Sequence, residues 1–283
     1  MKKLLVHLHI YYIEQIPELL QYMQNLQHIE HDLYITTPHN IKDIDPLIKP
    51  TLPHAIIKQV ENRGYDIGPF ISVLNQINLD DYQYVLKLHT KGKTSNNYTW
   101  LNNKRLDNAL WGKILWDSML LTEQRIDDNL AILDNNANIG MLGSIYCHTN
   151  NPKDYNHLLP QINNELTKAK LSAIEKLSFI AGSMFLAKAK LFKPLQTYNI
   201  TDFALTDGKI KEGTFAHVVE RLFGALITTQ NHTIHTIKHD DYCYRFLCMA
   251  IKRFLFQKKI TKSGKQIIKI CKIPVYSKKR DAA

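Results

Sequence analysis

KLLVHLHIYY, residues 3–12, is the most informative segment for the fold of this chain. It is a short run of apolar and β-compatible residues, which predicts a buried strand. Residues 16–26 carry apolar side chains at helical spacing, and Pro17 lies in the first turn, where proline is tolerated. Residues 32–37 form a second apolar run, which ends at Pro38. A strand, a helix and a strand in this order predict a βαβ unit of a parallel sheet.

The same alternation continues outward from this unit. Residues 55–60 and 84–88 predict two more strands, and residues 69–77 predict a helix between them. We therefore expect an α/β fold, a Rossmann-like and mostly parallel sheet flanked by helices. The second half is more mixed: it predicts helices over 102–132, 163–177 and 215–227, and strands over 139–143 and 179–186.

Composition and cysteine usage indicate a cytoplasmic protein. The chain has 283 residues, 45% of them hydrophobic, which is enough to bury a sizeable core. Its four cysteines form no C-x-x-C pair, and this scatter fits a reducing compartment. His7, His9 and Glu14 interrupt the first apolar run, so we expect no secretory signal. No stretch reaches the roughly 20 apolar residues that span a bilayer.

The net charge of +10 belongs to the end of the chain. Residues 243–283 contain 12 Lys and Arg and one acidic residue, whereas residues 1–242 contain 24 basic and 25 acidic residues. We expect a main domain over 1–242 to be followed by a basic, amphipathic and helical C-terminal segment over 243–283. Residues 246–255 place apolar side chains on one helical face among lysines and arginines, which predicts an amphipathic helix on the inner face of the cytoplasmic membrane.

Two other uses of the basic tail stay open at this point. It could be a solvated segment or a segment that docks on another protein. A nucleic-acid-binding module would show a fold signature beyond its charge, and the sequence has none, so we expect no nucleic-acid partner.

Two polar segments follow predicted strands, and ligands of open parallel sheets bind beyond the carboxyl ends of the strands. The first is ENRGYDIGPF, residues 61–70. Gly64 permits a tight turn, and Arg63 can pair with a phosphate. Asp66 can accept hydrogen bonds from a ribose hydroxyl or a base N–H, and Asn62 belongs to the same candidate donor site. The alternative is an ordinary turn between a strand and a helix, with surface charges.

The second segment is KLHTKGKTS, residues 87–95. It superficially resembles a phosphate-binding P-loop, but Lys87 stands where that motif requires glycine, so we reject a nucleoside triphosphatase. Its hydroxyls and amines still suit a diphosphate, although a solvated basic loop is the alternative. The candidate residues of this segment for contact with a diphosphate-bearing ligand are His89, Thr90, Lys91 and Lys93.

Two later segments contain further candidate site residues. His217 and Glu220 are three residues apart and share one helix face. Glu220 could deprotonate an acceptor hydroxyl, but a structural ion pair with Arg221 or an incomplete metal site would use the same residues. Gly182 and Ser183 interrupt an apolar strand, which lets a sugar approach the backbone or lets the core pack tightly.

Together these segments resemble the rhamnan synthesis F family of bacterial polysaccharide enzymes, over about residues 4–225. The most specific elements are residues 62–70 and the KLHTK of residues 87–91. Tyr65 departs from the family pattern, in which we expect arginine. The other matching stretches are residues 6–12, 32–37, 140–143, 181–185 and 216–224.

The resemblance implies an A-type nucleotide-sugar transferase fold and transfer of rhamnose or a related sugar. The donor it suggests first is dTDP-rhamnose, and the acceptor is a lipid-linked or lipopolysaccharide glycan. It implies Glu220 as the first candidate for the catalytic base and Asp66 as the second, with Gly182, Ser183 and His217 near the acceptor or sugar. The alternative is a non-catalytic subunit of a polysaccharide assembly complex that binds a nucleotide sugar or a glycan.

A-type transferases usually hold a divalent metal with an Asp-x-Asp element after the central strand. Here His89, Thr90 and Lys91 occupy that place. A protonated lysine cannot ligate a metal, but it can supply the positive charge itself. We therefore expect transfer that needs no metal and no other cofactor, with a divalent metal at the donor diphosphate as the alternative.

Overall fold

The computed structural model describes residues 2–92, 98–101, 104–206, 213–238, 255–260, 265–271 and 273–279. The chain divides into two compact units, Met1–Ile237 and Lys238–Ala283. The sequence had placed this boundary between residues 242 and 243. Lys93, one of the predicted donor contacts, lies outside the described residues.

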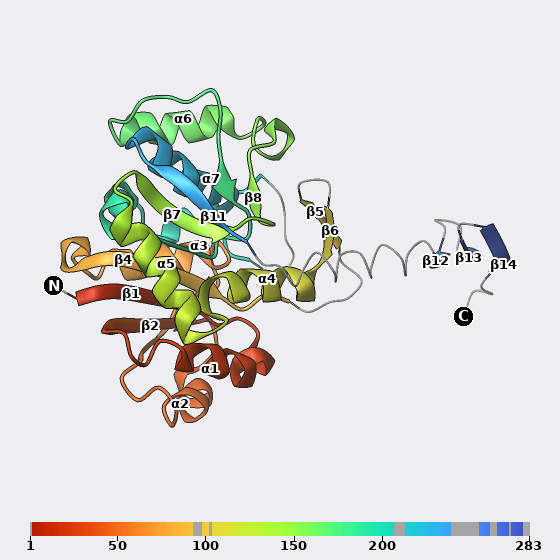
Figure 1. Ribbon diagram of the computed structural model, residues 1–283, viewed down its shortest axis with the longest axis horizontal. Helices are drawn as coiled ribbons and strands as arrows, with labels where there is room; N and C mark the ends of the chain where they lie inside the picture. The colour runs from red at the N-terminus through yellow and green to blue at the C-terminus, as the bar shows by residue number, and fades with distance from the viewer. Residues whose placement is uncertain are drawn as a thin grey trace. The chain divides into compact units, whose positions relative to one another are not determined.

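The first unit is built on a seven-stranded sheet in the order β11-β7-β10-β4-β1-β2-β3 (Figure 1). Its pairs are parallel except for those of β10, which runs antiparallel to both β4 and β7. This arrangement confirms the predicted α/β class and the mostly parallel sheet. The strands are β1 (Lys2–His9), β2 (His31–Thr37), β3 (Ile56–Gln59), β4 (Tyr82–His89), β7 (Ile139–Ser144), β10 (Phe185–Lys188) and β11 (Thr233–Ile237).

Helices cover the sheet on both faces, as a parallel sheet requires. Helices α4 and α5 pack on β7 and β10, whereas α3 packs on β1 and β2 (Figure 1). The helices are α1 (Ile16–Gln24), α2 (Ile41–Ile48), α3 (Ile67–Leu74), α4 (Asn108–Leu120), α5 (Glu123–Asn135), α6 (Leu159–Lys168) and α7 (Phe215–Thr229). Short 3-10 helices are η1 (Ile13–Gln15), η2 (Leu79–Asp81), η3 (Pro152–Asp154), η4 (Ala189–Thr197) and η5 (Ile200–Asp202).

Several boundaries differ from the prediction for local reasons. The single helix expected over 102–132 is two helices, because the Thr122 side chain accepts a hydrogen bond from the Arg125 amide and starts α5 afresh. Residues 104–107 of that stretch form instead strand β6 (Lys104–Asp107), which pairs with β5 (Tyr98–Leu101). Helix α6 ends well before the predicted residue 177. Helix α2 and strand β11 had no predicted counterpart.

The strand predicted over 179–186 is broken into two. Its first part, β9 (Phe179–Ile180), pairs with β8 (His148–Thr149), and its second part is β10. Between them Gly182 and Ser183 both have positive φ angles, 88° and 51°. A Cβ atom on Gly182 would lie 2.8 Å from Leu115 Cδ1, so only glycine fits this turn. The turn brings the backbone of Gly182 and Ser183 to the end of β4.

The second unit contains a three-stranded antiparallel sheet of β12 (Phe256–Ile260), β13 (Lys265–Ile270) and β14 (Ile273–Lys279). The tail was predicted to be helical, and its described residues differ from that prediction because isoleucine-rich segments favour extended strands. The helix itself was predicted over 246–255, of which only Leu255 is described. Among the described residues, no helix is both long and apolar enough to cross a membrane.

Candidate functional site

The candidate site lies where the strand order reverses, between β1 and β4. Strands β2 and β3 lie on one side of β1 and β4 lies on the other, which makes this the switch point where open α/β sheets bind ligands. Thr90 joins the two strand ends, because its Oγ1 accepts hydrogen bonds from the amides of Tyr11 (2.9 Å) and Tyr12 (3.0 Å). The second polar segment is therefore at the rim of the sheet, as predicted.

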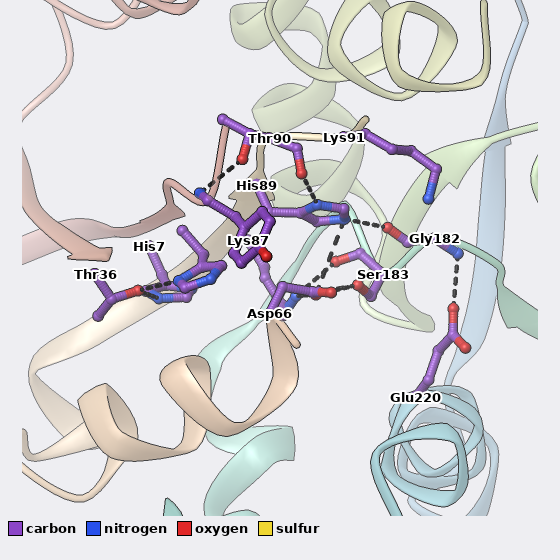
Figure 2. A network of polar contacts seen from close by, with 12 residues as sticks. His7, Thr36, Asp66, Lys87, His89, Thr90, Lys91, Gly182, Ser183 and Glu220 are labelled. Atoms are coloured by element: carbon purple, nitrogen blue, oxygen red, sulfur yellow. Dashed lines mark hydrogen bonds and ion pairs between the residues drawn. The ribbon is translucent and has the colours of Figure 1, made fainter. Parts of the chain in front are cut away.

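A buried ion pair joins the two predicted polar segments (Figure 2). Lys87 is fully buried on β4, and its Nζ donates hydrogen bonds to Asp66 Oδ2 and to the carbonyl and Oγ of Ser183, the last two at 3.1 Å. The Ser183 hydroxyl also donates to Asp66 Oδ2. The three protons of the ammonium are thus used within the protein. Lys87 is an internal counter-ion, which sequence reasoning missed because it lies inside a strand.

The environment keeps Asp66 ionised. Burial alone would raise the pKa of Asp66, but the charges of His89 and Lys87 and the hydrogen bonds from Lys87 and Ser183 outweigh it and hold the pKa well below its usual range. Burial lowers the pKa of Lys87, while Asp66 opposes that shift. A carboxylate with so low a pKa is a poor proton acceptor and a good hydrogen-bond acceptor.

His89 supports the site from within. Its Nδ1 lies 2.7 Å from the carbonyl of Thr90 and its Nε2 lies 2.8 Å from the carbonyl of Gly182. Burial lowers the pKa of His89, whereas Asp66, whose Oδ2 is 3.9 Å away, raises it. Trp116 Nε1 donates to the His89 carbonyl at 3.1 Å. Since its ring faces protein carbonyls on both sides, His89 orders the turn at Gly182 and does not reach outward to a donor.

Lys91 is the cation of the site that has no carboxylate partner among the described residues. Its Nζ lies 3.6 Å from the centre of the Trp111 ring, a cation–π contact. Its backbone is held by the Gln15 side chain, which donates to the Lys91 carbonyl at 2.6 Å and accepts from the Lys91 amide at 3.2 Å. Burial lowers the pKa of Lys91, and Asp66 and Glu220 raise it. Trp111 gave no signal in the sequence, because an aromatic residue in a helix is usually part of the core.

Glu220 comes to the same turn from α7. Its Oε1 accepts a hydrogen bond from the Gly182 amide at 2.7 Å, and its Oε2 accepts one from Arg221 Nη1 at 2.7 Å. The predicted Glu220–Arg221 ion pair is therefore present, and it lies within the site. Figure 2 shows the Lys91 side chain extending toward the Gly182–Glu220 contact. The two candidate carboxylates, Asp66 and Glu220, thus flank one turn of the chain.

His217 and Tyr65 lie at the edge of this arrangement. Their ring centres are 5.8 Å apart, and His217 Nδ1 lies 2.8 Å from Thr214 Oγ1. Tyr65, the departure from the family pattern, has a φ angle of 58°, a left-handed conformation that is uncommon for residues other than glycine. No group of three or more His, Cys, Asp and Glu residues among the described residues could hold a metal ion.

Asn62 and Arg63 have contacts other than those predicted. Arg63 donates from Nη1 to the Phe203 carbonyl at 3.0 Å and from Nε to Glu61, and Asn62 Nδ2 donates to the Thr206 carbonyl at 3.0 Å. A Cβ atom on Gly64 would lie 2.6 Å from Phe203 Cδ1, so this glycine permits packing against the protein. These three residues anchor the segment 203–206, and their contact with a nucleotide-sugar donor stays a prediction.

Comparison with known proteins gives the family. The model of rhamnan synthesis protein F matches residues 1–232. The chain belongs to this family. Two relatives from Xanthomonas campestris pv. campestris, from strain B100 and a second strain, are both called uncharacterized protein WxcX and are 28% identical to it over 249 residues. The matches cover 82% of this chain and 32% of each relative, so the chain spans about a third of their length.

Two solved structures are distantly similar to this member of the rhamnan synthesis protein F family. Residues 1–349 of TarS from S. aureus have a TM-score of 0.42 and 11% identity, over 89% of this chain and 65% of that one. A second structure of S. aureus TarS has a TM-score of 0.41 and 13% identity, over 89% of this chain and 40% of that one. Likenesses this weak do not bear on the activity of the chain.

Proposed function

We propose that this chain is an A-type glycosyltransferase domain that moves rhamnose or a related sugar from a nucleotide sugar to a growing bacterial surface glycan. The observation that carries the proposal is the meeting of Lys91, Asp66 and Glu220 at the carboxyl end of β4, around the turn at Gly182, where Trp111 contacts both Lys91 and Gly182. Membership of a family described by rhamnan synthesis supports the same substrate class.

In the mechanism we propose, an acceptor hydroxyl attacks the anomeric carbon as the bond to the nucleoside diphosphate breaks. The leaving diphosphate takes the bonding electron pair, and Lys91 stabilises its charge. Glu220 takes the hydroxyl proton. Asp66, ionised and held by Lys87, accepts hydrogen bonds from the donor nucleotide or sugar. Asp66 is thereby a donor contact, and the low pKa of its carboxyl leaves Glu220 as the base.

The groups at the end of β4 do not fit a divalent metal. Lys91 is a cation, both ring nitrogens of His89 face carbonyl oxygens, and Asp66 Oδ2 already accepts from Lys87 and Ser183. The proposal is therefore a transfer in which lysine supplies the positive charge and no cofactor takes part. We take dTDP-rhamnose as the first donor to test and a lipid-linked or lipopolysaccharide glycan as the acceptor.

Donor binding tests this proposal. We expect dTDP-rhamnose or a related nucleotide sugar to raise the melting temperature equally with EDTA and with Mg²⁺, because binding to the native state stabilises it. Lys91→Met should weaken donor binding by about 10- to 100-fold, since it removes a charge-assisted contact to the diphosphate. Lys193→Met, at an exposed ion pair with Asp80, is the control and should bind normally. A strict requirement for Mg²⁺ or Mn²⁺, or full binding by Lys91→Met, would exclude this mechanism.

A second candidate is a binding subunit without catalysis. Both oxygens of Glu220 already accept hydrogen bonds within the protein, as in a structural ion pair. The two candidates separate in one assay: purified protein that binds donor but neither hydrolyses nor transfers the sugar with an acceptor glycan is a binding subunit.

We also propose that the second unit attaches the chain to the inner face of the cytoplasmic membrane. Its described strands are rich in lysine, and each basic residue near an anionic surface contributes about 1 kcal/mol. Replacing four of these lysines by glutamine in the full chain should weaken co-sedimentation with phosphatidylserine vesicles by at least about tenfold. Binding equal to that of the unchanged chain would end this idea. The four are Lys258, Lys259, Lys265 and Lys269, and the matched control replaces the exposed Lys42, Lys153, Lys190 and Lys193.

A further inference from the structure

Arg221 is held in place by groups other than the carboxylate beside it. The residue is 8% exposed, and its guanidinium donates from Nε and Nη2 to the Asp154 carbonyl at 3.3 and 3.2 Å. Nη1 has a longer contact, 3.4 Å, to the His217 carbonyl one turn earlier on α7. The guanidinium carbon lies 5.1 Å from the centre of the Phe179 ring. The guanidinium would keep its orientation even if Glu220 were neutral, because these backbone carbonyls hold it.

Glu220 is therefore held between two fixed donors. The Arg221 Nη1 lies 2.7 Å from one carboxylate oxygen, and the Gly182 amide lies 2.7 Å from the other. The same Gly182 peptide presents its carbonyl to His89. Because both donors are rigid, the carboxylate has one plane and one direction available, and its second lone pairs are left for a substrate hydroxyl.

We propose that Arg221 is a positioning residue that aims the Glu220 carboxylate at the acceptor hydroxyl. The inference rests on the proposed function, in which Glu220 is the general base. Four of the five guanidinium N–H groups donate to Asp154, His217 and Glu220, so in this proposal Arg221 acts through Glu220 and not by contact with the substrate. The inference predicts that losing Arg221 slows proton transfer and leaves donor binding unchanged, since the diphosphate lies against Lys91.

A double-mutant cycle tests the proposal with Arg221→Met, Glu220→Gln and the two combined. We expect Arg221→Met to lower kcat by about 10- to 100-fold, part of what a general base contributes. The donor KM should change less than about threefold, because this contact belongs to the chemical step. The combined variant should be no more than about twofold slower than Glu220→Gln, since residues that act as one unit are not additive. Lys193→Met is the control for a lost surface charge.

Arg221→Lys is a conservative variant that keeps the positive charge but changes its geometry. If Arg221 had only a structural role, a folded Arg221→Lys protein would keep the kcat of the wild type. The lysine amine can reach Glu220 or the Asp154 carbonyl but not with the same fork, so kcat should fall between those of the wild type and Arg221→Met. If Arg221→Met fails to fold, as judged by circular dichroism, Arg221→Lys goes through the same cycle. In either cycle, full additivity with Glu220→Gln would overturn the proposal, as would a higher donor KM with unchanged kcat.

The outcomes also separate this inference from the proposed function. If Glu220→Gln is slow and Arg221→Met is fully active, only the proposed role of Arg221 is overturned. A fully active Glu220→Gln removes the base, and the role of Arg221 with it. Wild-type protein that binds donor and transfers no sugar to any acceptor glycan refutes the transferase itself.

Discussion

Replacing Lys87 by methionine is expected to lower the free energy of unfolding by about 3–5 kcal/mol, because it leaves a buried carboxylate without its partner. The Lys87 side chain is 0% exposed and that of Asp66 is 16% exposed, so water can compensate the carboxylate only in part for the lost ammonium. Ser183 would remain as a hydrogen-bond donor to Asp66, but it carries no charge. Urea denaturation at neutral pH measures the loss directly.

The partner residue supplies the control for Lys87. Adding Asp66→Asn to Lys87→Met removes the stranded charge, so the double variant should be more stable than Lys87→Met alone. Lys193→Met breaks an ion pair whose side chains are 47% and 61% exposed, and should cost no more than about 1 kcal/mol. A Lys87→Met protein within about 1 kcal/mol of the wild type would contradict the buried pair.

Mild acid is expected to destabilise the protein through two buried histidines on β1. The rings of His7 and His9 lie 2.8 and 3.0 Å from Thr36 Oγ1, and both residues are almost fully buried. Burial lowers the pKa of His9 from 6.5 to about 3, and burial with the charge of Lys87 lowers the pKa of His7 well below its ordinary value. Both rings are therefore neutral in the folded protein at neutral pH.

The sign follows from the direction of these pKa shifts. Each folded pKa lies below the unfolded one, so below about pH 6.5 the unfolded chain binds more protons than the folded chain. The contribution to stability is fully present above that pH and is lost as the pH falls. Each histidine can cost up to about 1.4 kcal/mol per pH unit, so the two together cost up to about 3 kcal/mol per unit.

Urea denaturation at pH 7, 6 and 5 measures this slope. His9→Asn should reduce the slope by up to about 1.4 kcal/mol per pH unit, because asparagine does not take up a proton in this range. His54 is exposed, so His54→Asn should leave the slope unchanged. Equal stability at pH 7 and pH 5 would show that the two rings are not buried as neutral groups.

Much of the first half of the chain could be predicted from the sequence. The strand at residues 3–12 appears as β1, and the helix and strand that follow it appear as α1 and β2. Apolar runs and helical spacing are local signals, and here the packing agrees with them. The meeting of the two polar segments also follows from the pattern, because parallel strands end at one rim.

Several site contacts could not be predicted, because they depend on which side chains meet across the fold. Lys87 reads as a residue of a strand until Asp66 and Ser183, 21 and 96 residues away, supply its partners. The hydrogen bond from Arg63 to the carbonyl of Phe203, 140 residues away, likewise gave no signal in the sequence. Burying an unpaired charge is costly, so a charged side chain in the interior pairs with a group that the fold places next to it.

Local sequence patterns were enough to predict the βαβ pattern, the rim on which the polar segments lie and the position of the basic tail, because hydrophobic periodicity and charge are properties of neighbouring residues. Only the tertiary structure decided that β10 enters the sheet antiparallel between β4 and β7. That insertion, with the left-handed turn before it, brings Gly182 to Glu220 and Ser183 to Asp66. Contacts between residues 38 and 117 positions apart depend on how strands pair, which no local pattern encodes.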